Sequence, residues 1–215
     1  ELNLTGTNIE KLPRSIARLG ALRTWELCHC TRLTELPEFP DQLKRINADW
    51  SNDSICNSLF KNIFLMKHDI SAPNSLTLRT ITSVGKNIPS WFHYQGIDIR
   101  IAVDLPKNWY LPGNFLGFAV CYSGKLIDIT VHLIPLRDGL SMTQKFSISN
   151  NSEYSPQHDI QFFLVPFAGL WRTSRARGSQ NDYGHICLNL SGEIKKVGFR
   201  LSYKDDPYGS FCRIL

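Results

Sequence analysis

The sequence predicts a mostly β protein in which the end of a repeating solenoid is followed by a β-sandwich. Apolar residues in the first third of the chain recur at intervals of about twenty residues. From about residue 70 the pattern changes to short apolar runs separated by turn residues, and helix signals are nearly absent. We therefore expect two domains, which cover residues 1–67 and residues 68–215.

The first domain contains the repeating pattern. Leu2 recurs as Trp25 and as Ile46, at offsets of 23 and 21 residues, which is the spacing of leucine-rich repeats. One repeat cannot bury its own apolar face, so we expect the array to extend before residue 1. We expect residues 49–67, which contain an apolar group around Leu59, to cap the array.

The short strand of each repeat lines the concave face of such a solenoid. The polar residues expected on this face are Asn3, Thr5, Thr24, Glu26, Cys28, Arg45, Asn47 and Asp49. A solvated surface is the simplest interpretation of any one of them. As a set they predict a partner-binding surface, for which Glu26, Arg45 and Asn47 are the candidate residues.

The second domain is predicted to be a jelly-roll-like sandwich of eight strands. The candidate strands are Leu76–Thr82, Ile97–Leu105, Phe115–Tyr122, Leu126–Leu133, Thr143–Ser149, Asp159–Val165, His185–Leu190 and Lys195–Tyr203. The run 97–105 alternates apolar and polar residues, as a strand with one solvated face requires, whereas 115–122 is apolar on both faces and is expected in the middle of a packed sheet. Two sets of residues are expected to face inward: Ile127, Ile129, Val131 and Leu133, and Val197, Phe199, Leu201 and Tyr203.

The composition is that of a globular protein. Hydrophobic residues make up 42% and charged residues 20% of the 215 residues, which excludes disorder, and no apolar run approaches the about 20 residues that span a bilayer. The net charge of +5 would favour an acidic partner. It is too small for the dense basic stripe of a nucleic-acid-binding domain, so neither a membrane nor a nucleic acid is an expected partner.

The cysteines bear on the compartment of the protein. Six are present: Cys28, Cys30, Cys56, Cys121, Cys187 and Cys212. They are few for the length and several lie in apolar strand patterns, so we expect reduced thiols and a cytoplasmic protein, with the nucleus as a further compartment. Four N-x-S/T sequons, at Asn3, Asn52, Asn150 and Asn189, leave a secreted protein open as the alternative.

Known catalytic and metal-binding patterns are missing from the sequence. Cys28-His29-Cys30 has ligand-type residues, but the spacing is too short for a zinc pair and no second pair follows. Cys30 instead occupies the repeat position where Asn or Cys bonds the loop backbone. No histidine has a triad partner at a recognisable spacing, and no glycine-rich phosphate loop is present. We predict no metal, no cofactor, no catalytic residue and no enzymatic activity in this chain.

Two aromatic clusters, Trp91-Phe92-His93-Tyr94 and Trp109-Tyr110, allow two interpretations. Large rings supply much of a sandwich core, so a hydrophobic plug between the sheets is the preferred one. The alternative is a solvent-exposed platform on which sugars stack, which would make the domain a carbohydrate-binding module. Exposure of these rings distinguishes the two.

A polar loop at residues 171–178 combines one tryptophan with three arginines, Trp171, Arg172, Arg175 and Arg177. A solvated basic loop is the plain interpretation. The functional interpretation is a contact for an acidic surface, because Trp and Arg are frequent at the energetic centres of protein interfaces. These four residues complete the predicted partner-binding set.

Three separated phrases of the second domain carry a family resemblance. They are Ile88-Pro89-Ser90-Trp91-Phe92, Leu105-Pro106-Lys107-Asn108-Trp109-Tyr110 and Phe115-Leu116-Gly117-Phe118-Ala119. In this order they closely resemble the domain called C-JID, or post-LRR domain, which follows the leucine-rich repeats in plant TIR-type NLR disease-resistance proteins. A weaker similarity continues through residues 163–166 and 182–184 to residues 196–203.

The resemblance implies a function in plant innate immunity. In that family the repeats and the C-JID together bind a pathogen effector protein, binding promotes assembly of the receptor, and a separate TIR domain hydrolyses NAD. This chain would be the sensor end, with the effector and other domains of the same receptor as partners. We expect it to be monomeric alone, within a receptor that forms oligomers on activation.

Overall fold

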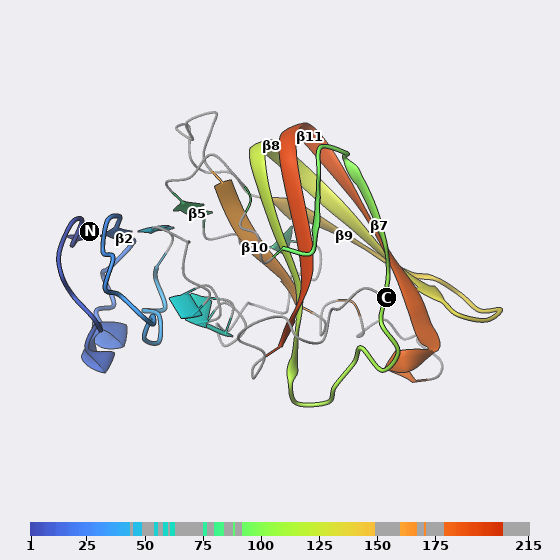
Figure 1. The fold of residues 1–215 in the computed structure, drawn as a ribbon, viewed down its shortest axis with the longest axis horizontal. Helices are drawn as coiled ribbons and strands as arrows, with labels where there is room; N and C mark the ends of the chain where they lie inside the picture. Colours follow the sequence, from blue (N-terminus) through green and yellow to red (C-terminus); the bar gives the residue numbers. More distant parts are fainter. Residues whose placement is uncertain are drawn as a thin grey trace.

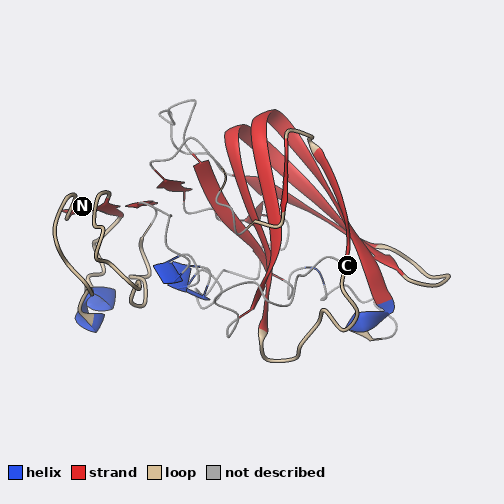
Figure 2. Ribbon diagram, viewed as in Figure 1, coloured by secondary structure: helices blue, strands red, loops and turns tan. Residues whose placement is uncertain are grey.

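A computed structural model describes residues 1–43, 45–48, 54–55, 58–59, 61–62, 75–76, 80–83, 88, 92–148, 160–166, 170 and 179–203. Within these ranges the chain is mostly β, as predicted (Figure 1, Figure 2). Helical structure is limited there to two 3-10 helices, η1 (Arg14–Arg18) and η2 (Gln180–Asp182), to the described residues between 54 and 62, and to Leu170.

The N-terminal part stacks short parallel strands. They are β1 (Leu2–Asn3), β2 (Thr24–Leu27) and β3 (Arg45–Ala48). Leu2 pairs with Trp25 and Trp25 with Ile46, so the offsets found in the sequence are the register of the sheet. Trp25 and Ile46 are buried because one face of each strand packs against the loops that connect the strands. Assignment of these coils to the leucine-rich-repeat class stays a prediction.

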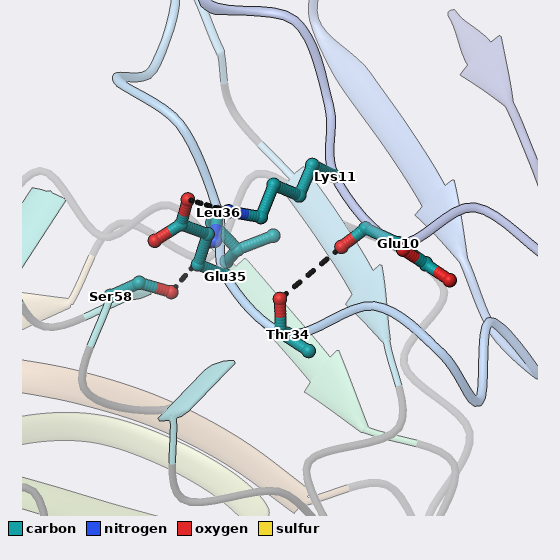
Figure 3. A network of polar contacts seen from close by, with 6 residues as sticks. All are labelled: Glu10, Lys11, Thr34, Glu35, Leu36 and Ser58. Atoms are coloured by element: carbon teal, nitrogen blue, oxygen red, sulfur yellow. Dashed lines mark hydrogen bonds and ion pairs between the residues drawn. The ribbon is translucent and has the colours of Figure 1, made fainter.

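Polar contacts join successive coils away from the strands (Figure 3). Thr34 Oγ1 donates to the carbonyl of Glu10 at 3.3 Å, and the Leu36 amide donates to Ser58 Oγ at 2.9 Å. Nearer the strands, Cys30 Sγ donates to the carbonyl of Leu4 at 3.0 Å, as predicted for this repeat position. These hydrogen bonds pair backbone carbonyl and amide groups that lack a partner strand.

The remaining strands build the C-terminal part. They are β4 (Ser75–Leu76), β5 (Thr80–Ser83), β6 (Tyr94–Gly96), β7 (Arg100–Asp104), β8 (Phe115–Pro135), β9 (Met142–Ile148), β10 (Ile160–Pro166) and β11 (Tyr183–Tyr203). Strands β8 and β11 are 21 residues long, and each merges two predicted strands. They pair with each other over their whole length and bend together, so each contributes to two layers (Figure 1).

The two layers share these long strands. The layer we call the junction sheet contains β1, β2, β3, β5, β10, the first part of β8, the last part of β11 and β6. The layer we call the outer sheet contains β4, β9, the second part of β8, the first part of β11 and β7. Because β3 pairs in parallel with β5, the sheet of the N-terminal coils continues into the sandwich without interruption. The predicted boundary between residues 67 and 68 lies outside the described residues.

Two hydrophobic clusters lie on opposite faces of the junction sheet. One cluster fills the sandwich between the two layers and includes Phe118 and Tyr122. The other joins Trp25 of the coils to Cys121 and Phe162 on the opposite face. The first part of β8 is therefore buried on both faces, as its apolar sequence predicts.

Four sequence predictions differ from the observed fold. The predicted strand Leu76–Thr82 corresponds to two strands, β4, which pairs with β9, and β5, which pairs with β3 and β10. Alternation predicts Ile127 inside, but it is 53% exposed, because the pairing of β8 with β11 skips this residue and Leu126 turns inward in its place. Ile97 and Ile99 are predicted within a strand, but β7 begins at Arg100 and both side chains are exposed. Strand β6 is absent from the predicted strands.

Candidate functional site

The candidate partner-binding residues of the coils form a hydrogen-bonded group. Glu26 and Asn47 are register partners on β2 and β3, so their side chains leave the same face of the sheet. Asn47 Nδ2 donates to both carboxylate oxygens of Glu26, at 2.7 and 2.6 Å. Arg45 Nε donates to Asn47 Oδ1 at 3.1 Å. The sequence predicts all three residues, and we call them the concave triad.

The triad places a negative and a positive group on either side of one amide. Asn47 is oriented by both neighbours, since its nitrogen faces Glu26 and its oxygen faces Arg45. All three residues are half-buried, which limits their rotamer freedom before any partner binds. Such a preorganised pair of opposite charges suits recognition of a protein surface of complementary charge.

The row that contains Glu26 and Asn47 continues into the sandwich. Asn47 pairs with Thr82 on β5, Thr82 pairs with Gln161 on β10, and Gln161 pairs with Tyr122 on β8. Gln161 and Tyr122 are buried there, and the Tyr122 hydroxyl donates to Gln161 Oε1 at 2.7 Å. The same face of one sheet is thus half-exposed at the coils and covered by the outer sheet at the sandwich.

The other predicted contact residues, Trp171, Arg172, Arg175 and Arg177, lie outside the described residues. The segment that follows them is well anchored. Ser179 caps η2 with a capping box, and Asn181 exchanges hydrogen bonds with the backbone of Tyr110, at 3.0 and 3.2 Å. The described chain therefore resumes at Ser179 in a segment that is anchored to the sandwich.

The family model described as the C-JID domain matches residues 83–208, more than half of the chain. The chain belongs to the C-JID family. It is 46% identical, over an alignment of 245 residues, to TMV resistance protein N of Nicotiana glutinosa, which covers 96% of this chain and 21% of that protein. It is 26% identical over 159 residues to Disease resistance-like protein DSC1 of Arabidopsis thaliana, covering 55% of this chain and 13% of that protein.

These matches confirm the resemblance drawn from the three phrases, all of which lie within residues 83–208. The chain spans about a fifth of the length of the first relative. C-JID is a recognition domain without catalytic activity. Both relatives are named as resistance proteins of plants.

The C-JID phrases supply core residues. Phe92 is 1% and Trp109 2% exposed. Trp109 packs against Phe115 and Phe118, with ring centroids 5.1 and 5.7 Å away, and its Nε1 donates to the carbonyl of Tyr183 at 2.8 Å. Trp109 and the rings around it form the predicted plug between the sheets, whereas Phe92 packs on the opposite face of the junction sheet, in the cluster shared with the coils. Neither Phe92 nor Trp109 can serve as the exposed sugar platform of the alternative hypothesis. Trp91 lies outside the described residues.

None of the described cysteines, Cys28, Cys30, Cys121 and Cys187, takes part in a disulfide. No group of three possible ligand residues that could hold a metal ion is found in the described part of the chain. No described helix has the length and apolarity needed to cross a membrane.

Proposed function

We propose that this chain is the ligand-sensing part of an intracellular plant immune receptor. It binds a pathogen effector protein and thereby promotes assembly of the receptor and defence signalling. The observation that supports this best is the concave triad, a preorganised charged group on a sheet that continues into the C-JID. The disease-resistance proteins among its relatives agree with it.

A rigid sheet makes effective recognition of a protein possible. Side chains that are already ordered lose little entropy on binding, so more of the contact energy contributes to affinity. Glu26 and Arg45 would supply the charged contacts at the coils. Trp171, Arg172, Arg175 and Arg177, which precede η2 in the sequence, would extend the surface. Other domains of the same receptor are further partners in this proposal, and the compartment is the cytoplasm, with the nucleus in addition.

The name of the first relative indicates which probes to use first. Each protein encoded by tobacco mosaic virus would be immobilised and tested for binding of the chain by biolayer interferometry. We expect one of them to bind. Glu26→Gln and Arg45→Met should each weaken that binding about thirtyfold if they are hot spots, whereas a solvated charge should cost less than about fivefold.

Glu35→Gln is the matched control. Glu35 belongs to the same coils but lies at the loops, where it pairs with Lys11 at 3.7 Å (Figure 3). Its replacement should leave binding unchanged. Binding that is equally strong for all three variants would exclude the concave triad from the site, and loss of binding by the control would indicate general damage to the coils.

A further inference from the structure

The hairpin loop between β8 and β9 lies at the end of the molecule opposite the coils (Figure 1). It exposes large aliphatic side chains. Leu136 is 62%, Leu140 is 73% and Ile134 is 37% exposed. The two charged residues between these leucines, Arg137 and Asp138, are exposed as well. We call residues 134–140 the hairpin tip.

The hairpin tip is held in place by the segment that precedes and begins β11. The Leu136 amide donates to the carbonyl of Asp182 at 2.8 Å, and the Tyr183 hydroxyl donates to the carbonyl of Leu140 at 3.4 Å. Leu136 also lies so close to Gly184 that a Cβ atom there would overlap it. The leucines are therefore presented by an ordered backbone, which lowers the entropic cost of binding through them.

The charges of the hairpin tip indicate which partner can bind it. Arg137 and Asp138 are adjacent and opposite in charge, and they stand beside two exposed leucines. When two identical surfaces meet about a two-fold axis, a contact of one residue with a second occurs twice, because the second residue of the first copy also contacts the first residue of the other copy. Arg137 of one copy can then pair with Asp138 of the second, twice, around a cluster of four leucines.

We propose that the hairpin tip is a self-association site whose partner is the hairpin tip of a second copy of this chain. The contact is small, because stable interfaces use about 20–30 residues from each side. It is therefore weak for the free chain and becomes effective when other contacts hold two copies close together, by raising their effective concentration. Self-association through the hairpin tip does not require effector binding, so a test of one does not decide the other.

The first test is sedimentation velocity of the chain over a series of concentrations. The weight-average sedimentation coefficient of the wild type should rise with concentration. The double variant Leu136→Ser/Leu140→Ser should remain monomeric throughout. Leu19→Ser, which alters a 50% exposed leucine in the coils, should behave as the wild type. A wild type that stays monomeric at every concentration would overturn the proposal.

The charges allow a sharper test. Arg137→Asp leaves two acidic residues at the tip and Asp138→Arg leaves two basic ones, so each variant alone should associate at least about tenfold more weakly than the wild type. An equimolar mixture of the two should restore association, because each acidic tip then meets a basic one. Unchanged thermal melting would show that both variants are folded. If the mixture does not associate, or if neither single variant is weakened, the tip is not the site of self-association.

Discussion

The hydroxyl of Tyr122 on β8 donates a 2.7 Å hydrogen bond to Gln161 on β10 inside the sandwich, in the row that holds Asn47 at the coils. Burial raises the pKa of Tyr122 above its ordinary value of 10.0. The folded protein therefore retains this proton at alkaline pH values where the unfolded chain has lost it. The retained proton contributes to the free energy of unfolding. This contribution is fully present below pH 10 and is lost as the pH rises above 10.

Tyr122→Phe should remove this pH dependence. We expect the wild type to lose free energy of unfolding more steeply than the variant between about pH 9 and pH 11, because only the wild type must keep a buried phenol protonated. At neutral pH the variant should be less stable by about 1 to 3 kcal/mol, since Gln161 Oε1 loses a donor. Urea denaturation at each pH measures both effects, and parallel pH profiles would contradict the first.

Phe118→Ala should cost about 3 to 5 kcal/mol of stability, the usual loss for a buried phenylalanine. Phe118 is fully buried and packs against Trp109, Phe115 and Phe199. Ile127→Ala on the same strand is the matched control, and it should cost less than about 0.5 kcal/mol because that side chain is exposed. Thermal and urea denaturation measure the two losses, and a similar loss for both would contradict the observed bulge.

The contrast between Phe118 and Ile127 shows how far the sequence could predict this fold. Apolar residues on both faces of residues 115–122 predict the burial of Phe118 correctly. Alternation also places Ile127 inside, but the bulge there depends on the partner strand, where Gly192 adopts a φ of +133° and leaves no room for a Cβ atom. Local periodicity contains no information about such a position on another strand.

The candidate site was predictable to a similar extent. The offset between Glu26 and Asn47 follows from the repeat, so the repeat period alone predicts that the two residues are adjacent. Pairing of β3 with β5 does not follow from it, because this pairing joins segments of different pattern across residues that carry no repeat. For the same reason the sequence does not predict the ordered leucines of the hairpin tip.

Gly192→Ala should destabilise the sandwich by more than an ordinary surface substitution. The residue would have to adopt a positive φ and its Cβ atom would overlap the carbonyl oxygen of Lys125. Gly20→Ala is the control, because nothing lies within 4 Å of a Cβ atom at that position. We expect a loss of about 2 to 4 kcal/mol for the first variant and less than about 1 for the second, measured by urea denaturation. Equal stability of the two would indicate that β11 does not bend at Gly192.

The thiols should react in an order set by burial. Cys28 is half-buried, whereas Cys30, Cys121 and Cys187 are buried. Brief treatment of the native protein with iodoacetamide should label Cys28 first, and the other three should react only in denaturant. Mass spectrometry of peptides from alkylated, unreduced protein measures this. A disulfide involving any of the four would contradict the structure and the predicted cytoplasmic location.

The last prediction concerns the dependence of the C-JID on the coils. Ile160, Phe162 and Cys121 lie on the face of the junction sheet that shares a hydrophobic cluster with Trp25 and Ile46. Removing residues 1–67 would expose part of this face to water. We expect the fragment 68–215 to bind a hydrophobic dye, to melt at a lower temperature than the full chain and to aggregate.

Ile160→Lys separates exposure of this face from general instability. Ile160 is fully buried in the chain, at the end of β10 that pairs with β5, the strand next to β3. In the full chain a buried lysine should destabilise the fold strongly. In the fragment 68–215 the same residue would face water, so the substitution should reduce dye binding and aggregation. If the fragment melts like the full chain and binds no dye, or if Ile160→Lys damages both forms equally, the coils do not cover this face of the C-JID.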